Sequence, residues 1–297
     1  MQLALKIDVD TYRGTRVGVP RMVEVLKKRR AGGTFLFSLG PDNTGRAIRR
    51  VLRPGFFSKV QRTSVVSHYG LRTLLNGTLL PGPDIGRRCA DAMRYARESG
   101  FEVGIHCWDH VRWQDFMVSK PADWVEREME RAFVRFREVF GDEARTWGAA
   151  GWQTSRHAAW VQEVRCDYAS DTRGTGPFRP LWDGVAIGCP QLPTTLPTLD
   201  ELIGRDGMTE DTVSGFLLGA TEEKKDHVFT AHAEIEGGKL LGVLERLLEG
   251  WQQQGYDIVS TRALFESLAV ERLPRCEVIF GEVPGRSGTL ALQGGQS

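Results

Sequence analysis

The residues best suited to chemistry begin with two aspartates near the N-terminus. Asp8 and Asp10 stand two positions apart at the end of an apolar run that starts at Leu3. Successive side chains of a strand point to opposite faces, so the two carboxylates share one face. Buried carboxylates on one face are costly unless a cation or a proton lies between them. The pattern therefore predicts a cation site at the end of the first strand.

A pair of histidines offers further ligands for such a cation. His106 and His110 stand at positions i and i+4. On one turn of helix both imidazoles would lie on the same face and could bind one ion. With a carboxylate from the first strand they make a set of two histidines and one carboxylate, which leaves coordination positions open for water and substrate. Hydrogen-bonded loop residues are the alternative for an isolated pair, but the aspartate pair favours a metal site.

Two more polar residues end apolar runs later in the chain. Asp171 follows the run 167–170, and His232 follows the run 227–231. Open α/β sheets and β/α barrels build their sites at the C-terminal ends of strands. We therefore expect His232 to be a general acid and Asp171 to hold it in its cationic form. The alternative for Asp171 is a turn cap.

The elements that must position these residues alternate between strands and helices. This alternation predicts an α/β fold with a mostly parallel sheet, in which strand ends far apart in the sequence converge. The strands are expected at about 3–10, 34–38, 101–105, 146–149, 167–170, 227–231 and 256–259. The helices are expected at about 20–30, 84–99, 121–140, 155–164, 209–218, 239–254 and 262–268.

Composition indicates an ordinary globular protein of 297 residues, 41% hydrophobic, with a formal net charge of +1. We expect one catalytic domain over residues 1–280 and a flexible tail, rich in Gly and Ser, over residues 281–297. The five cysteines are scattered without a CxxC pair, which argues against a thiolate zinc site and favours a reducing, cytoplasmic setting. The near-neutral charge does not point to nucleic acid, and nothing in the sequence indicates a protein partner.

The sequence carries no sign of a membrane-spanning segment. The N-terminus runs straight into the first strand, which does not resemble a signal peptide. No apolar run approaches the roughly 18 residues that a membrane span needs. Residues 44–83 are instead candidates for a peripheral contact with a membrane surface, because they carry basic residues and no acidic one.

This basic segment has two interpretations. Apolar residues such as Phe56 and Phe57 are interleaved with the basic ones, and such a mixture suits the surface of an anionic membrane. A helical insertion packed on the protein body, with an arginine-rich outer face, fits equally well, since periodicity does not separate the two. The candidate lipid-binding residues are Arg46, Arg49, Arg50, Arg53, Lys59 and Arg62.

Together these motifs resemble those of the polysaccharide deacetylases, the NodB-homology family. The resemblance implies a distorted (β/α) barrel, here with the insertion 44–83, and a metal-dependent hydrolase that removes acyl groups from sugar nitrogens. The divalent ion would be Zn²⁺ or another transition metal such as Co²⁺, Mn²⁺ or Ni²⁺. The motifs are Asp8-Val9-Asp10, His106 to His110, Ala149-Ala150-Gly151-Trp152, Asp171, and Thr230-Ala231-His232.

Longer segments resemble one subgroup of that family, which deformylates a lipid-linked amino sugar. The implied substrate is undecaprenyl-phosphate-linked 4-deoxy-4-formamido-L-arabinose, and the implied place is the cytoplasmic face of the inner membrane. The step would serve lipid A modification and polymyxin resistance. An N-deacetylase of another glycan and a non-catalytic anionic-lipid-binding protein are the alternatives. The segments are 7–16, 40–43, 177–180, 196–206 and 232–237.

The resemblance also implies roles for individual residues. By the order of the family motif, Asp8 is the base and Asp10 the metal ligand, although both could touch the metal. A backbone N–H near Trp152 would stabilise the oxyanion. Arg173 and Arg179 could bind the substrate phosphate, or form surface salt bridges.

The third motif departs from the family pattern. It usually carries an arginine that orients the base, whereas the segment 149–152 has none. Another residue must therefore orient Asp8. Arg173 is a candidate because it lies close to Asp171 in the sequence.

Overall fold

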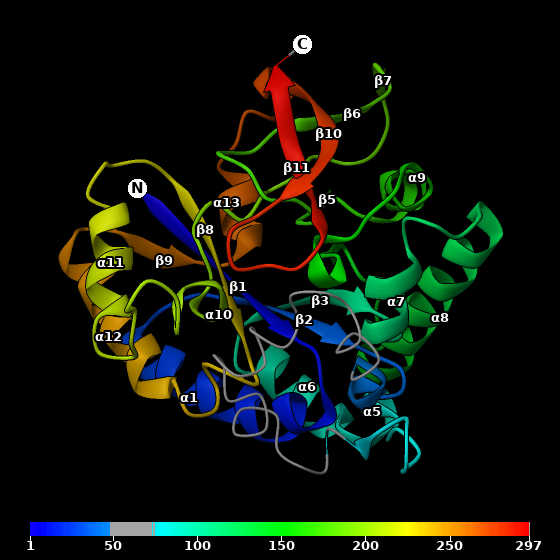
Figure 1. Cartoon of the computed structure of the whole chain (residues 1–297), viewed down its shortest axis with the longest axis horizontal. Coiled ribbons are helices and arrows are strands. Elements are labelled where there is room, and N and C mark those ends of the chain that lie inside the picture. Colours follow the sequence, from blue (N-terminus) through cyan, green and yellow to red (C-terminus); the bar gives the residue numbers. More distant parts are fainter. Residues whose placement is uncertain (48–72, 74, 297) are drawn as a thin grey trace.

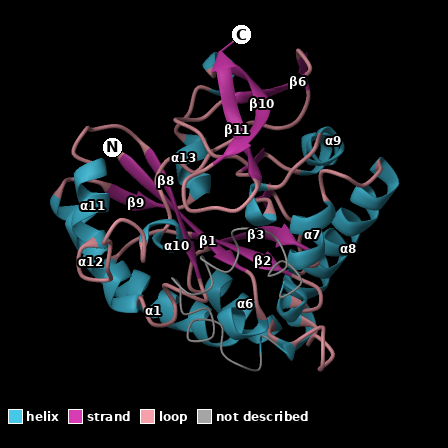
Figure 2. Ribbon diagram, in the orientation of Figure 1, coloured by secondary structure: helices cyan, strands magenta, loops and turns pink. Residues whose placement is uncertain are grey.

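A computed structural model of the chain describes residues 1–47, 73 and 75–296. Within these residues the core is a seven-stranded sheet in the order β5-β4-β3-β2-β1-β8, with β9 also paired to β1 (Figures 1 and 2). Every pairing in this sheet is parallel, as predicted. The strands are β1 (Gln2–Val9), β2 (Thr34–Ser38), β3 (Glu102–Cys107), β4 (Thr146–Trp147), β5 (Tyr168–Ala169), β8 (His227–His232) and β9 (Asp257–Val259).

An extended segment at residues 190–195 links the two edges of this curved sheet. The Leu192 N–H donates to the Ala169 carbonyl of β5 at 2.8 Å, and the Thr195 N–H donates to the Val228 carbonyl of β8 at 3.0 Å. The sheet is thereby completed to a distorted barrel. The predicted α/β fold is confirmed.

Alternation along β1 separates the helix-facing side of the sheet from the barrel interior. Leu3, Leu5, Ile7 and Val9 are fully buried in the main apolar cluster. The intervening side chains, which include Lys6 and Asp8, therefore face the other way, into the barrel. Charged residues thus occupy the interior face of a strand whose other face packs against helices.

Helices cover the outside of the sheet (Figure 2). None of the helices formed by the described residues is long and apolar enough to cross a bilayer. The helices are α1 (Val19–Arg29), α5 (Ile85–Arg88), α6 (Ala90–Glu98), α7 (His110–Phe116), α8 (Ala122–Phe140), α9 (Arg156–Arg165), α10 (Leu199–Leu202), α11 (Val213–Ala220), α12 (Leu241–Gln253) and α13 (Thr261–Glu266).

Two local structures differ from their predictions. The helix expected at 84–99 is divided into α5 and α6 at Cys89, whose φ of −124° and ψ of 18° leave the helical region. The helix expected at about 20–30 is preceded by a π-helix at Gly14–Gly18 that leads directly into α1. The expected insertion 44–83 lies largely outside the described residues.

The C-terminal residues, which were expected to form a flexible tail, belong to a second sheet. Four strands in the order β11-β10-β6-β7 form it: β6 (Arg179–Trp182), β7 (Val185–Ala186), β10 (Arg275–Glu282) and β11 (Thr289–Gln296). Antiparallel pairing joins β10 to β11, from Glu282 opposite Thr289 to Cys276 opposite Gln296. The prediction of a flexible tail from residue 281 was wrong, because residues 289–296 are a paired strand. Figure 1 shows this hairpin standing beside the barrel.

Candidate metal centre and active site

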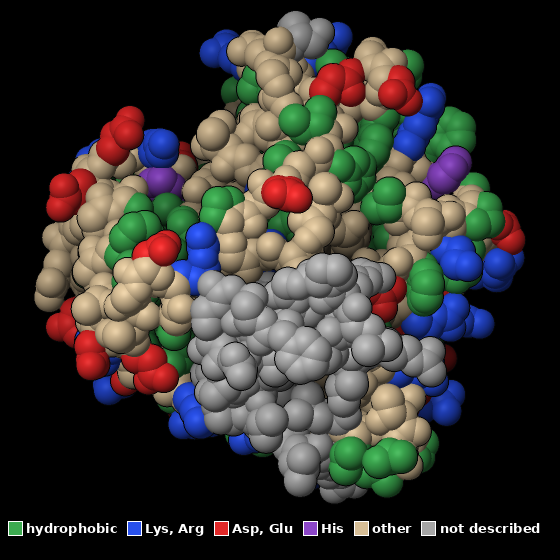
Figure 3. Space-filling model, viewed as in Figure 1, with side chains coloured by type: hydrophobic (Ala, Val, Ile, Leu, Met, Phe, Trp, Pro, Cys, Tyr) green, Lys and Arg blue, Asp and Glu red, His purple; other side chains and the backbone are tan. Residues whose placement is uncertain are grey.

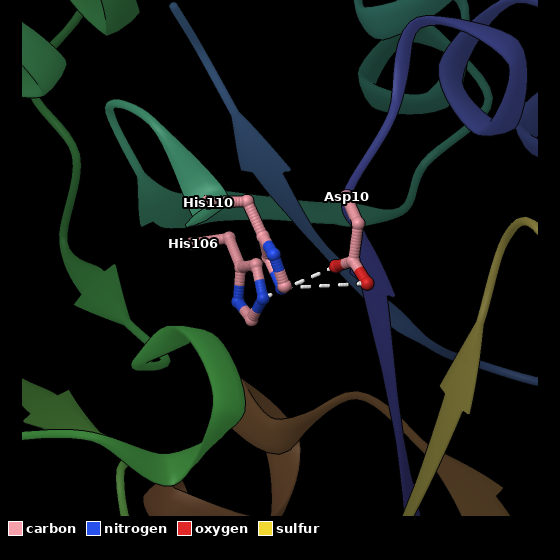
Figure 4. A group of neighbouring side chains, drawn as sticks. All are labelled: Asp10, His106 and His110. Atoms are coloured by element: carbon pink, nitrogen blue, oxygen red, sulfur yellow. Dashed lines mark ion pairs between the residues drawn. The ribbon is translucent and has the colours of Figure 1, made fainter. Parts of the chain in front are cut away.

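Three predicted metal ligands come together at the C-terminal ends of β1 and β3. Asp10 follows β1, His106 lies near the end of β3, and His110 begins α7. His106 Nε2 lies 3.2 Å from Asp10 Oδ1, and His110 Nε2 lies 3.5 Å from Asp10 Oδ2. One ligand atom from each residue lies within 4.8 Å of the other two (Figure 4). Donor atoms this close can bind one ion.

The two histidines converge differently from the prediction, which placed both on one helical turn. His106 belongs to a strand and His110 to the first turn of the next helix. Their rings still stack, with centroids 5.4 Å apart. Asp109 fixes the start of that helix, because its carboxylate accepts the Arg112 N–H at 3.1 Å and the Asn43 amide at 2.6 Å.

The protonation of the His106 ring suits a metal ligand. His106 Nδ1 lies 2.7 Å from the Gly148 carbonyl. A carbonyl oxygen only accepts hydrogen bonds, so Nδ1 carries a proton, and Nε2, which faces Asp10, is the nitrogen left to bind an ion. A hydrogen bond of this kind commonly fixes the tautomer of a metal-binding histidine.

Electrostatics at the site also fits a cation. Burial acts to raise the pKa of Asp10, but the nearby imidazoles of His110 and His106 hold that pKa far below its usual range. Within the described residues, Asp8 Oδ1 and Asp10 Oδ1 are buried without a hydrogen-bond partner. Two such carboxylate oxygens beside two imidazoles form a donor set suited to a divalent ion.

Lys6 lies next to the predicted base, and we had not predicted its role. Its side chain is completely buried, and Nζ lies 3.4 Å from Asp8 Oδ2. The ammonium group also donates to the Ser170 carbonyl at 3.1 Å and lies 5.3 Å from the Trp152 ring centroid. The described contacts of Asp8 therefore include a lysine where the family motif led us to look for an arginine. The sequence did hold a signal, because Lys6 and Asp8 share one face of a strand.

His232 is the neighbour of Asp8 in the sheet. In the register of β1 and β8, Asp8 is paired with His232. The His232 backbone N–H donates to Glu236 Oε2 at 2.8 Å, and its Nδ1 lies 3.9 Å from Asp200 Oδ1. The predicted base and acid thus come from adjacent strands at one end of the barrel.

Asp171 is fully buried, but its contacts are not those expected. Its carboxylate accepts the Ala149 N–H at 2.8 Å and the Gln162 side-chain amide at 2.8 Å. Burial raises the pKa of Asp171 to about 6. The carboxylate beside the imidazole of His232 is that of Asp200, not Asp171. Asp171 therefore anchors the turn that begins at Ala149, which matches the alternative of a turn cap.

That turn holds Trp152 in an unusual backbone conformation. Trp152 has φ of +52°, and its N–H donates to the Ala149 carbonyl at 3.1 Å. This amide is therefore already engaged, contrary to a direct oxyanion role for it. The indole is buried, and the guanidinium of Arg173 lies 5.0 Å from its ring centroid. Arg173 forms an ion pair with Glu201 and donates to the Leu196 carbonyl, so its charge is already balanced inside the protein.

Comparison with known proteins adds a decisive relationship. No family model matches the chain. Over 294 residues it is 35% identical to a protein of Shewanella sediminis (strain HAW-EB3) named "Probable 4-deoxy-4-formamido-L-arabinose-phosphoundecaprenol deformylase ArnD", covering 98% of this chain and 94% of that protein. The chain belongs to the ArnD family. A protein of the same name from Wigglesworthia glossinidia brevipalpis is 29% identical, with coverage of 94% and 98%.

A solved structure supports the fold of this ArnD-family chain. A putative polysaccharide deacetylase from Mycobacterium smegmatis superposes with a TM-score of 0.61 at 13% identity, covering 95% of this chain and 96% of that one. The predicted resemblance to polysaccharide deacetylases is confirmed. At this identity the likeness shows the fold alone.

Other residues predicted for substrate or lipid contact lie elsewhere in the ArnD-family chain. Arg179 is exposed at the start of β6 in the second sheet, and its backbone N–H donates to the Pro274 carbonyl. Arg46 is exposed and donates to the Gly77 carbonyl at 2.9 Å. Acidic and basic side chains are interspersed over the described part of the face in Figure 3. The remaining basic candidates lie outside the described residues: Arg49, Arg50, Arg53, Lys59 and Arg62.

Two buried glutamates of the turn after β8 brace the site and were not predicted. Glu234 Oε1 accepts the N–H groups of Asp10 and Thr11, at 3.0 and 2.7 Å. Glu236 accepts the His232 N–H, and burial raises its pKa to about 7. Burial, with the charge of Asp10 as a further cause, also raises the pKa of Glu234. These carboxylates fix the backbone of the candidate metal ligand Asp10 and of His232.

Proposed function

We propose that this protein is a metal-dependent deformylase of undecaprenyl-phosphate-linked 4-deoxy-4-formamido-L-arabinose. The products are the amino sugar and formate. The full-length similarity to a protein named for that deformylation is the observation that carries the proposal. The triad of Asp10, His106 and His110, next to Asp8 and His232, supplies the groups that amide hydrolysis needs.

Asp10, His106 and His110 would hold the divalent ion. When bound, that ion supplies Lewis acidity for the formyl carbonyl and lowers the pKa of water. Asp8 accepts the proton of the attacking water as general base. The ammonium of Lys6 lies 3.4 Å from Asp8 Oδ2, so a positive charge faces this base.

His232 acts on the other side of the scissile bond. It donates a proton to the sugar nitrogen as the C–N electron pair moves onto that nitrogen, so the amine leaves neutral. The pairing of Asp8 with His232 in adjacent strands supports this division of roles between a base and an acid.

Formate release from the lipid-linked formamido sugar tests this function. Metal-loaded protein should release formate, and a chelator should stop the release until metal is restored. Release of acetate from N-acetylated sugars, without formate from the lipid-linked substrate, would instead establish a deacetylase. A protein that binds anionic lipid but releases neither acid is non-catalytic, and the proposal would be wrong.

We also propose that the protein works at the cytoplasmic face of the inner membrane. A substrate anchored by a polyprenyl chain stays in the bilayer, so the enzyme must meet it at the surface. The basic and apolar residues of 44–83 are the sequence-based candidates for this contact. The protein should float with vesicles containing phosphatidylglycerol at low salt and be released at high salt. Absence of binding at low salt would contradict this proposal.

A further inference from the structure

His232 has a buried ring nitrogen that points toward a carboxylate. Within the described residues, Nδ1 of His232 has no hydrogen-bond partner, and Asp200 Oδ1 lies 3.9 Å away. A buried polar nitrogen without a partner is costly. A small shift of either side chain would close this gap to a hydrogen bond, leaving the other ring nitrogen, Nε2, for the substrate.

Asp200 is held in place by a guanidinium rather than by its own short helix. Arg286 Nη1 lies 2.9 Å from Asp200 Oδ2, and Arg286 Nη2 lies 3.0 Å from Asp200 Oδ1. Two parallel contacts between an arginine and a carboxylate fix orientation as well as distance. The Thr198 hydroxyl also donates to Asp200 Oδ1 at 2.6 Å.

Arg286 comes from the turn at residues 283–288, between β10 and β11, and is itself fixed on several sides. Its Nε donates to Glu201 Oε1 at 2.8 Å, and its guanidinium lies 4.6 Å from the Trp152 ring centroid. The preceding residue, Gly285, has φ of +90°, and a Cβ there would lie 2.5 Å from the Glu201 carbonyl. The turn therefore approaches α10 as closely as its backbone allows.

We propose that Arg286 and Asp200 are a positioning pair for His232, delivered to the barrel by the second sheet. Asp200 accepts a hydrogen bond from the Nδ1–H group of His232 and stabilises the imidazolium. Arg286 keeps Asp200 ionised and aimed at the ring. His232 then donates its Nε2 proton to the leaving sugar nitrogen. The assignment rests on the proposed function in that His232 is the general acid of amide hydrolysis.

A double-mutant cycle with His232 tests the pair through activity. Asp200→Asn and Arg286→Gln should each lower kcat by about tenfold or more, with KM and bound metal unchanged. In a His232→Gln background, the same changes should alter the residual kcat by less than about twofold. Losses of equal size in both backgrounds would overturn the proposal, because they would show a role independent of His232.

Two further variants separate this role from support of the fold. Arg286→Lys keeps the charge and should retain more activity than Arg286→Gln. Arg205→Gln is the matched control. Like Arg286, Arg205 contacts Glu201, but it donates to the backbone carbonyl of Glu201, whereas Arg286 also contacts the Asp200 carboxylate. The control should keep wild-type kcat. Equal losses in Arg205→Gln and Arg286→Gln would mean that only the loop structure is involved.

A spectroscopic readout stays informative even when no substrate turns over. In ¹H–¹⁵N spectra of metal-loaded protein, the His232 signals are identified by their loss in His232→Gln, among the six histidines of the chain. A protonated Nδ1 is expected in the wild type, and Asp200→Asn should shift or abolish it. An unchanged Nδ1 signal in Asp200→Asn would refute the pair. Failure of formate release with an intact signal change would count against the substrate alone.

Discussion

Lys6 Nζ lies 3.4 Å from Asp8 Oδ2, and both side chains are buried on the barrel side of β1. A buried ion pair gives little net stability, but removal of one partner leaves an uncompensated charge. The pair lies beside His106, whose pKa is raised above its ordinary value because the charges of Asp8 and Asp10 outweigh the effect of burial. Lys6 therefore belongs to the chemistry of the site as well as to the core.

Replacing this lysine should impair catalysis more than metal binding. Lys6→Met removes the ammonium and leaves most of the side-chain volume. We expect kcat to fall by about tenfold or more, because the base loses the charge that stabilises it, while metal content persists. Lys28→Met is the matched control, since Lys28 forms an ion pair with Glu245 at the surface. Equal kcat in Lys6→Met and wild type would rule out this role.

Metal content should distinguish a variant of the proposed base from a variant of a proposed metal ligand. Asp8→Asn should lower kcat by about a hundredfold or more and retain the ion, because the triad does not include Asp8. His106→Ala should lose both the ion and activity. Metal is measured by mass spectrometry after dialysis, beside the rate of formate release. Loss of metal in Asp8→Asn would make Asp8 a ligand and not only a base.

Much of the fold could be predicted from local patterns. The apolar run that starts at Leu3 and ends in Asp8 and Asp10 predicted β1, and the amphipathic run 121–140 predicted α8 to within one residue. The final hairpin could not be predicted in this way. Its glycine-rich sequence resembles a tail, and β11 becomes a strand through pairing with β10.

In the site, too, some residues could be predicted from the local sequence, whereas others depend on contacts between distant segments. Spacing was enough to single out the aspartate pair, His106 and His110, because donor residue types and strand ends are visible in the sequence. The choice of Asp10 over Asp8 as the ligand came from the order of the family motif. Spacing could not select Asp200 over Asp171 as the carboxylate near His232. That choice depends on where the loop after residue 190 crosses the barrel and where Arg286 arrives from the second sheet.

Asp171 should matter for stability with a defined pH dependence. Its pKa in the folded protein is about 6, raised by burial from the ordinary value of 3.8. A carboxyl group with a raised folded pKa binds more protons in the folded state, so its contribution to stability is lost as pH rises from about 4 to about 6. Urea unfolding should show this decrease in wild type relative to Asp171→Ala. Parallel pH profiles for the two proteins would contradict the assignment.

The same variant should also loosen the turn at residues 149–152. Asp171→Ala leaves the buried Ala149 N–H and the Gln162 amide without their acceptor, which should cost about 2 kcal/mol of unfolding free energy at low pH. Fluorescence of Trp152 is a local readout of the turn, checked against a Trp152→Phe variant. If Asp171 instead acted directly on His232, Asp171→Ala would leave the unfolding free energy unchanged and lower kcat alone.

Gly14 provides a test of how the backbone of the metal ligand is supported. A Cβ at position 14 would lie 1.9 Å from Glu234 Oε1, the atom that accepts the N–H groups of Asp10 and Thr11. Gly14→Ala must displace that carboxylate and disturb the end of β1. Groups that orient ligands typically contribute about 10- to 100-fold to metal affinity. We therefore expect a weaker Kd for Co²⁺ by that factor in calorimetric titration, with a matching loss of activity at limiting metal.

Gly176→Ala is the matched control, since a Cβ there meets nothing within 4 Å. Excess Co²⁺ should restore part of the activity of Gly14→Ala, because the three ligands themselves remain. Unchanged metal affinity in Gly14→Ala would show that Asp10 keeps its position without Glu234.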